Sequence, residues 1–437
     1  MALNILIIGS GAREHAIVRA IDASNRQKNV FCIASNLNPG IVELCDELIV
    51  GDFNDPDFVV SYAKEVNANL VIIGPENPLA QGVADSLLDA NIRVVGPKKD
   101  LAQIETSKAF TRDLLSKHNI AGGPKYKTFS SIHGVSKFLS DLGQHYVVKF
   151  DGLAGGKGVK VSGEHLHSHK EATDYCSEII TNKGTFVIEE KFIGEEFSLM
   201  SFCDGETLKH MPVVQDHKRA FENDTGPNTG GMGTYSDANH SLPFLNKRDI
   251  EEAKSINQET VKALKNEFNQ GYVGILYGGF IATENGVKLI EYNARFGDPE
   301  AMNVLSILDS DFLEICDLMT QKRLKDIDII FKNKATVCKY AVPNGYPNKP
   351  VKGQPIDLNK IENPDNLYYA SVDIKNGVLV ESGSRTVAYV GTGDTIFSAE
   401  KIVESEISKV RGPVFHRSDI GKEELISKKI NHMKSLR

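Results

Sequence analysis

The chain has 437 residues, which is enough for about three domains at roughly 150 residues each. Its 50 basic and 58 acidic side chains give a net charge of −8, which is the opposite of the basic surface that nucleic-acid binding requires, so no nucleic-acid partner is expected. No apolar run reaches the roughly 18 to 20 residues that a membrane-spanning helix needs, and the six cysteines occur singly. We therefore expect a cytoplasmic protein with reduced thiols and no membrane partner.

The first hundred residues alternate short apolar runs with amphipathic stretches. NILIIG, VFCIA and LVIIGP end in or near Gly or Pro, whereas REHAIVRAID has helical periodicity. Continuous Ile, Val and Leu runs of this kind are typical of parallel strands that are buried on both faces. The pattern predicts an α/β N-terminal domain over residues 1–105.

Three further segments are expected after this domain. A helix should begin at Thr106 or Ser107, whose hydroxyl can cap it, and open a small α+β lobe over 106–193. Residues 194–330 have longer strands and polar loops, which indicates a central domain. Short strands and turns over 331–437 indicate a small β-rich C-terminal domain. The fold class is therefore multidomain, with α/β and α+β parts.

The turn in GSGAREHA places Gly9 and Gly11 between a strand and a helix. Backbone N–H groups at such a helix start can meet an anion. The dinucleotide fingerprint fails because Glu14 stands where the third glycine belongs. A tight connecting turn is one interpretation. We prefer a site for a small phosphate ester, because Arg13 adds a fork-shaped donor beside the turn.

A second glycine cluster, VVKFDGLAGGKGVKV, spans residues 147–161. It lacks the spacing and the hydroxyl of a Walker loop. Its flanking β-type runs predict a hairpin whose glycine-rich tip closes over a triphosphate while Lys149 and Lys157 neutralise the charge. The alternative is an ordinary mobile hairpin with solvated lysines.

Two strands carry polar groups at positions suited to nucleotide and metal binding. In TFVIEEKFIGEEFS the strand end offers groups for an adenine edge and a ribose, although a solvated sheet edge would look the same. In VKLIEYNARFGDPE alternation places Leu289, Glu291, Asn293 and Arg295 on one face and Tyr292 on the other. Such a face suits a magnesium ion and a phosphate or carboxylate clamp, and the alternative is a polar sheet edge with an internal Glu–Arg pair.

For two residues the sequence does not decide between a functional and a structural role. His217 lies in the long polar loop 216–235 and is equally well a general base or a hydrogen-bonding spacer. Glu76 follows a strand-ending Gly-Pro turn and is either a ligand group or a carboxylate at a helix N-terminus.

Taken in order, the motifs resemble those of the phosphoribosylamine–glycine ligase (glycinamide ribonucleotide synthetase) family of the ATP-grasp superfamily. They are GSGAREHA, GPENPLAQG, IETSKAFTRDLL, VVKFDGLAGGKGV, VIEEKFIGEEFS, DHKRAFENDTGPNTGGMGTYS and IEYNARFGDPE. The loop DTGPNTGGMG and the segment RFGDPE are the most specific of these. The resemblance implies that ATP phosphorylates the glycine carboxylate, and that the amine of 5-phosphoribosylamine then displaces phosphate, in purine biosynthesis.

The resemblance also assigns roles to individual residues. Those that would bind ATP are Lys108, Lys149, Gly155, Gly156, Lys157 and Gly158 at the phosphates, Glu189 and Phe192 at the adenine, and Glu196 at the ribose. Glu291 and Asn293 would hold Mg²⁺ or Mn²⁺. Gly11, Arg13, Glu14 and Glu76 would lie near 5-phosphoribosylamine. The glycine and transfer site would contain Asp216, Lys218, Arg295 and Asp298, with the first three as catalytic residues.

The chain departs from the family pattern in small ways. IETSK replaces LEGSK, LAGGKG replaces LAAGKG, and the strand before Glu291 offers only Glu284, near a turn, as a third metal ligand. The alternatives are an ATP-grasp ligase for another small carboxylate such as formate or bicarbonate, a nicotinamide-dependent oxidoreductase, and a nucleotide sensor without turnover. A monomer is expected, with a dimer as the alternative.

Overall fold

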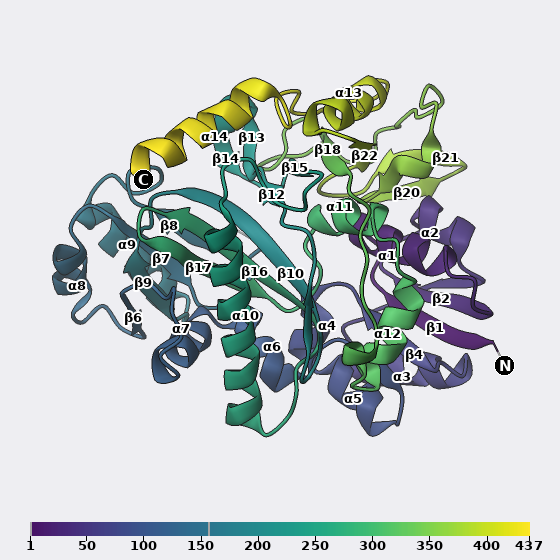
Figure 1. Ribbon diagram of the computed structural model, residues 1–437, viewed down its shortest axis with the longest axis horizontal. Coiled ribbons are helices and arrows are strands. Elements are labelled where there is room, and N and C mark those ends of the chain that lie inside the picture. The colour runs from purple at the N-terminus through teal and green to yellow at the C-terminus, as the bar shows by residue number, and fades with distance from the viewer. Residues whose placement is uncertain (1, 156–157) are drawn as a thin grey trace.

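The computed structural model describes residues 2–155 and 158–437. It begins with a five-stranded parallel sheet in the order β3-β2-β1-β4-β5, drawn in purple and blue in Figure 1. The strands are β1 (Leu3–Ile8), β2 (Lys28–Ala34), β3 (Glu47–Val50), β4 (Leu70–Ile73) and β5 (Arg93–Val95). The helices between them are α1 (Ala12–Asp22), α2 (Pro39–Leu44), α3 (Pro56–Glu65), α4 (Glu76–Gln81) and α5 (Val83–Asp89). β1 pairs in parallel with β2 and β4, and Ile5 to Ile8 are fully buried, which confirms the predicted parallel sheet.

The strand order reverses direction between β1 and β4. In doubly wound sheets, ligands bind in the crevice outside the carboxyl ends of strands at such a switch point. Gly9 and Gly74 directly follow the two strands there. The topology therefore leaves the N-terminal glycine turn and Glu76 at the end of the sheet where a ligand is expected.

The next segment contains a small lobe with its own hydrophobic core. Helices α6 (Lys99–Thr106) and α7 (Lys108–Lys117) lead into a sheet in the order β6-β9-β7-β8. Ser107 caps α7 by accepting a hydrogen bond from Phe110 N–H, as predicted. The lobe consists of β6 (Tyr126–Phe129), α8 (Val135–Leu142), β7 (Tyr146–Phe150), β8 (Val159–Val161), α9 (His169–Thr181) and β9 (Phe186–Glu190). β7 and β8 pair antiparallel, which confirms the predicted hairpin.

A four-stranded sheet in the order β11-β10-β16-β17 forms the centre of the molecule. Figure 1 shows it between the small lobe and the N-terminal sheet, with the long helix α10 (Lys247–Phe268) in front of it. Its strands are β10 (Glu195–Asp204), β11 (Leu208–His210), β16 (Val273–Thr283) and β17 (Gly286–Asn293). Two helices follow, α11 (Glu300–Ser306) and α12 (Phe312–Thr320), with the short η2 (Leu324–Asp326).

The C-terminal sheet includes strands from the central segment. Its order is β12-β15-β18-β22-β19, and β23 also pairs with β18. β12 (Gln215–Asp216) and β15 (Gly233–Ser236) lie before the boundary predicted near residue 330, whereas β18 (Ala335–Pro343), β19 (Leu367–Tyr369), β22 (Val387–Gly393) and β23 (Val414–Phe415) lie after it. The polar loop that begins at Asp216 is thus anchored at both ends in this sheet.

The remaining elements complete the C-terminal part and the loop. The loop carries a small hairpin of β13 (Arg219–Phe221), η1 (Glu222–Asp224) and β14 (Thr225–Asn228). The C-terminal part adds η3 (Pro364–Asn366), β20 (Val372–Lys375), β21 (Val378–Glu381), α13 (Ile396–Ile407) and α14 (Glu423–Leu436). α14 returns to the central sheet, where Lys429 pairs with Glu195 at 3.2 Å. In the described part of the chain, the helices lack the combination of length and apolar character that a membrane span needs. The six cysteines are free thiols, as expected.

His15 on α1 joins the N-terminal sheet to the C-terminal part. Its ring lies 5.5 Å from that of Tyr368 and 5.8 Å from that of Tyr369, and its Nδ1 accepts the Tyr369 N–H at 3.1 Å. Burial lowers the pKa of His15 well below its usual range, so the ring is neutral. A Cβ at Gly40 would lie 2.1 Å from this ring. Gly40 on α2 is therefore required for the packing.

We predict that Gly40→Ala lowers the free energy of unfolding by about 1–3 kcal/mol, because overpacking displaces His15. Alanine ordinarily stabilises a helix relative to glycine, so a loss at this helical position is diagnostic. Urea unfolding measures the change. Gly123→Ala is the matched control, since its Cβ would meet only Leu115 at 3.8 Å. Equal stability of the two variants would contradict the packing role of His15.

Candidate active site

A pocket of about 790 Å³ lies where the N-terminal sheet, the small lobe, the central sheet and the C-terminal part meet. Most of the side chains predicted for the site line this one pocket. They are Arg13, Glu76, Lys108, Lys149, Gly155, Gly158, Glu189, Phe192, Glu196, Asp216, Lys218, Glu291, Asn293, Arg295 and Asp298. Gly156 and Lys157 lie outside the described residues. Residues from the beginning and the end of the chain, such as Arg13 and Lys429, thus meet in one pocket. Gly11 lies close by, since a Cβ there would be 3.9 Å from the Asp298 carboxylate.

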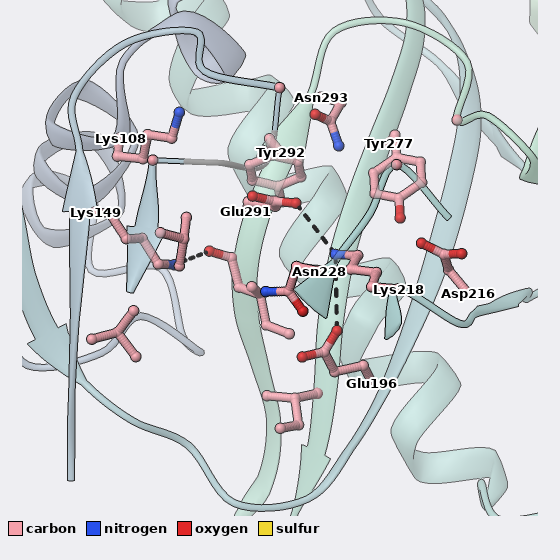
Figure 2. Close-up of a pocket in the computed structure, with 18 of the residues that line it drawn as sticks. Lys108, Lys149, Glu196, Asp216, Lys218, Asn228, Tyr277, Glu291, Tyr292 and Asn293 are labelled. Atoms are coloured by element: carbon pink, nitrogen blue, oxygen red, sulfur yellow. Dashed lines mark hydrogen bonds and ion pairs between the residues drawn. The ribbon is translucent and has the colours of Figure 1, made fainter. Parts of the chain in front are cut away.

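Glu291 at the end of β17 lies among cations. Its Oε1 is 3.6 Å from Lys218 Nζ, which is also 3.9 Å from Glu196 Oε2, and Figure 2 shows Lys218 between the two carboxylates. Burial alone would raise the pKa of Glu291, but Lys218, Lys149 and Lys108 lower it to about 2. Burial lowers the pKa of Lys218, and the surrounding carboxylates more than reverse this effect. Both groups are therefore charged at neutral pH.

A β-bulge changes the predicted face of β17. Gly279 pairs with Glu291 and Phe280 pairs with Leu289, so Ile290 is an extra residue in the ladder. As a result Ile290 and Glu291 both line the pocket, whereas Leu289 is fully buried in the core. The prediction that Leu289 shares the face of Glu291 was wrong, because strict alternation does not pass through a bulge. Tyr292 also lines the pocket, while its hydroxyl donates to Thr260 on α10 at 2.9 Å.

Lys149 and Glu189 form a buried ion pair on neighbouring strands β7 and β9. Arg112 from α7 joins them, with its Nε 2.7 Å from Glu189 Oε2 and its Nη2 3.1 Å from Oε1. Burial alone would raise the pKa of Glu189, but Arg112 and then Lys149 lower it below its usual range. The carboxylate is therefore ionised and held by two cations, and its role at adenine stays a prediction.

Lys108 begins α7 and reaches the glycine-rich hairpin. Its Nζ donates to the Gly152 carbonyl at 2.6 Å. Asp151 in the same turn accepts the Ala109 N–H at 3.2 Å, which ties the hairpin to the start of α7. Gly155 has a positive φ of 53°, and a Cβ there would meet nothing within 4 Å. The base of the hairpin is therefore fixed, and its described residues Gly155 and Gly158 line the pocket.

Asp216 and Glu300 are two carboxylates that line the same part of the pocket and influence each other. Glu300 accepts the Tyr277 hydroxyl at 2.8 Å. Asp216 Oδ1 is buried and has no hydrogen-bond partner among the described residues. Burial and then Glu300 raise the pKa of Asp216 to about 8, and burial also raises the pKa of Glu300. A carboxyl with such a pKa exchanges a proton near neutral pH.

Arg385 of the C-terminal part holds the polar loop over this corner. It donates to the carbonyls of Gly230 at 2.5 Å, Gly231 at 3.1 Å and Asp298 at 3.0 Å. Its Nη2 also pairs with Asp298 Oδ1 at 3.1 Å, and its guanidinium lies over the Tyr340 ring. Asp298 is thus a fixed carboxylate that fastens the RFGDPE segment to the loop.

His217 is buried beside this loop, and its ring packs against Tyr235. Burial, followed by the charge of Lys429, lowers its pKa to about 3, which is far from the value that suits a general base at neutral pH. Neither ring nitrogen has a hydrogen-bond partner within the described residues, so the spacer interpretation has no contact to support it either. In this structure His217 contributes packing.

Glu14 fills the glycine turn of the N-terminal sheet. Its Oε2 accepts the Gly11 N–H at 2.7 Å, and its Oε1 accepts Arg13 Nε at 2.6 Å. Cβ atoms at Gly9 and Gly74 would lie 2.7 and 2.1 Å from the Glu14 side chain, so both glycines make room for it. The carboxylate occupies the turn where a dinucleotide phosphate binds in other sheets of this type. Gly11 and Glu14 do not line the main pocket, and their substrate roles stay predictions.

Arg295 lies between two carboxylates that hold it in place. Its Nη2 is 2.9 Å from Glu105 Oε1, and its Nε is 3.4 Å from Glu76 Oε2. Burial alone would raise the pKa of Glu76, but Arg295 and Arg13 lower it to about 2. Arg13 lies 4.0 Å from Glu76, so a chain of charges links the N-terminal turn to β17.

Five residues that sequence reasoning did not single out complete the site. They are Glu105, Arg112, Tyr277, Glu300 and Arg385. Glu105 and Glu300 lie within the motifs IETSK and RFGDPE, so the sequence could have indicated both as site residues. Arg112 looks like a surface residue of an amphipathic helix. Nothing in the local sequence around Arg385 connects it with a loop about 150 residues earlier.

Comparison with known proteins identifies the family. Models of the phosphoribosylglycinamide synthetase N domain, ATP-grasp (A) domain and C domain match residues 3–105, 106–301 and 336–423. The chain belongs to the phosphoribosylglycinamide synthetase family. It is 50% identical over 445 residues to phosphoribosylamine–glycine ligase of Methanocaldococcus jannaschii and 48% identical over 435 residues to that of Methanosarcina barkeri, with complete coverage of both chains in each case.

A solved structure of the family has the same architecture. Phosphoribosylamine–glycine ligase from Thermotoga maritima is 26% identical and superposes with a TM-score of 0.83, covering 96% of this chain and 100% of that one. The match confirms the predicted multidomain α/β and α+β fold with ATP-grasp lobes.

The oxygen donors of this synthetase-family site fit a divalent metal ion. Glu291 and Asn293 both line the pocket at the end of β17. The described residues contain no cluster of three or more acidic, His or Cys groups able to hold a metal by themselves. Glu284, the other candidate, lies exposed in the turn after β16. Mg²⁺ is commonly held by one or two protein oxygens together with substrate phosphates, and this chain offers that arrangement.

We predict that Asp216→Asn stabilises the protein at pH 8. With a pKa of about 8 in the folded state against 3.8 as the ordinary value, the folded wild type keeps a proton that the unfolded chain releases. Its stability therefore falls as pH rises through this range, and Asn removes the effect. Denaturant unfolding measures the free energy of unfolding of both proteins. The difference between Asp216→Asn and the wild type should increase from pH 4 to pH 8.

The control for this experiment is Asp141→Asn on α8, where the aspartate is exposed. Its free energy of unfolding should follow that of the wild type at every pH. If the difference in free energy of unfolding between Asp216→Asn and the wild type did not change with pH, the carboxyl would be ionised in the folded protein over the whole range.

Proposed function

We propose that the chain is an ATP-dependent ligase that joins glycine to 5-phosphoribosylamine and releases ADP and phosphate, as a step of purine biosynthesis. The observation that carries the proposal is the convergence of Lys149, Lys218 and Arg295 around Glu291 in one pocket. Similarity along the whole chain to phosphoribosylamine–glycine ligases supports the choice of substrates.

The first step transfers the γ-phosphoryl group of ATP to glycine. A glycine carboxylate oxygen forms a bond to phosphorus as the bond to the bridging oxygen of ADP breaks. This transfer needs positioned positive charge more than a covalent nucleophile. We assign Lys108 and Lys149 to the ATP phosphates and Lys218 and Arg295 to the reacting carboxylate and phosphoryl oxygens. Glu291 and Asn293 would hold Mg²⁺ or Mn²⁺, which neutralises phosphate charge.

The second step forms the amide. The amine nitrogen of 5-phosphoribosylamine attacks the acyl carbon, and phosphate leaves with the electrons of the C–O bond. The nitrogen must lose a proton, and the proposed acceptor is the Asp216 and Glu300 pair in the fraction of molecules in which Asp216 is ionised. A pKa of about 8 suits a group that takes and returns protons near neutral pH.

The N-terminal crevice is the proposed site of 5-phosphoribosylamine. It lies at the switch point of the sheet, and Arg13 and Glu76 connect it by charge to Arg295. The glycine-rich hairpin is proposed to cover the phosphates, which would keep water from the acyl phosphate. Its central residues Gly156 and Lys157 are outside the described part of the chain.

The predicted activity is ADP release that requires magnesium, ATP, glycine and 5-phosphoribosylamine together. Phosphoribosylamine is generated in situ, and each component is omitted in turn. Release that ignores glycine but depends on formate or bicarbonate would identify a ligase for another carboxylate. No release by verified folded protein would contradict the proposal.

We predict that Glu291→Gln raises the magnesium concentration for half-maximal activity at least about tenfold, because the loss of an anionic oxygen weakens the metal site. A magnesium titration of the initial rate measures it. Glu284→Gln makes the same change in the turn before β17 and should behave as the wild type. An unaltered titration for Glu291→Gln would remove this residue from the metal site.

A further inference from the structure

Arg112 lies at a junction of three parts of the molecule. It stands on α7, its side chain is 2% exposed, and it makes a two-pronged contact with Glu189 of the small lobe. Its Nη2 also donates to the Ile290 carbonyl at 2.6 Å. Ile290 is the bulged residue of β17, directly before Glu291. One guanidinium thus fastens the small lobe to the strand that carries the proposed metal ligand.

Lys149 uses the same two acceptors as Arg112. Its Nζ pairs with Glu189 and donates to the Ile290 carbonyl at 3.0 Å, a bond that is dashed in Figure 2. Two cations therefore share one carboxylate and one carbonyl in a buried cluster. Arg112 has a further nitrogen, Nη1, that is buried without a hydrogen-bond partner among the described residues. Within the cluster two cations share one carboxylate, and the charge of Glu291 acts on Lys149 from the pocket side.

The sharing of Glu189 by two cations matters when the nucleotide binds. Under the proposed function, Lys149 binds an ATP phosphate, and to do so it must give up part of its contact with Glu189. A carboxylate that is left unpaired in a buried position is strongly unfavourable. Arg112 prevents this, because its planar fork satisfies both oxygens of Glu189 without Lys149.

We propose that Arg112 is a positioning residue for ATP binding: it neutralises Glu189 and holds the Ile290 carbonyl, so that Lys149 is free to turn to the nucleotide phosphates. This inference rests on the proposed function for the role of Lys149. In this role Arg112 does not contact the reacting atoms. The bulge at Ile290 serves the same role, because it presents a carbonyl to both cations beside Glu291.

The test removes the charge of Arg112 and measures nucleotide binding. In Arg112→Met, Lys149 is the only partner of Glu189, so the dissociation constant of the nonhydrolysable analogue AMP-PNP with magnesium should rise about tenfold, as for the loss of one charged hydrogen bond. Binding of adenosine, which has no phosphates, should stay within twofold of the wild type. Lys117→Met, an exposed lysine on the same helix, is the matched control and should change neither constant.

A second variant separates this role from general damage to the lobe. Adding Glu189→Gln to Arg112→Met removes the carboxylate that retains Lys149. Because Glu189 is itself predicted at the adenine, the affinity for AMP-PNP is compared with that for adenosine, and this ratio should recover by at least about threefold over the single variant. Arg112→Lys keeps the charge without the fork and should lie between Arg112→Met and the wild type. If Arg112→Met does not fold by circular dichroism, Arg112→Lys with and without Glu189→Gln gives the same comparison.

Three results would overturn the proposal. They are unchanged AMP-PNP affinity in Arg112→Met, an equal loss of adenosine and AMP-PNP binding, and no recovery when Glu189→Gln is added. All of these measurements omit glycine and 5-phosphoribosylamine. A failure of the ligase assay would therefore contradict the proposed function and leave the test of Arg112 intact.

Discussion

The pairing of Lys218 with Glu291 is the interaction on which the site depends. Lys218 lies in the polar loop and Glu291 at the end of β17, and the charge of each helps to keep the other ionised in the pocket. A buried lysine alone would lose its proton and a buried glutamate alone would gain one. Under the proposed function, phosphoryl transfer needs the lysine charged and metal binding needs the carboxylate charged. The pair would then hold both groups in the required charge state before any ligand binds.

The same matching of charges joins the parts of the molecule to one another. Arg295 connects Glu105 of α6 with Glu76 of the N-terminal sheet, and Arg385 connects the C-terminal part to the polar loop and Asp298. The pocket is thus formed by contacts between segments and belongs to none of them. Substrates that bind to different segments can meet there, as a ligase with three substrates requires.

Much of the fold was open to prediction because it depends on local patterns. Ile5 to Ile8 form a continuous apolar run, and a buried parallel strand follows from it directly. Ser107 caps α7 because its hydroxyl precedes a helical pattern. The bulge at Ile290 escaped prediction, since it is set by the pairing of β17 with β16 and leaves no mark on the alternation of the sequence. The strands β12 and β15 likewise join the C-terminal sheet for reasons of tertiary contact.

By itself, the sequence determined the kinds of chemical group in the site, the family and the elements that carry most of these groups. Glycine turns, strand-borne lysines and a Glu-x-Asn-x-Arg run are local, and local spacing limits which faces they can share. Only the tertiary structure decided which charges meet. It brought Arg112 to Glu189, placed Arg385 over Asp298, and filled the first glycine turn with Glu14. The reason is physical: the charge state of a buried group depends on neighbours that are distant in the chain and close only after folding.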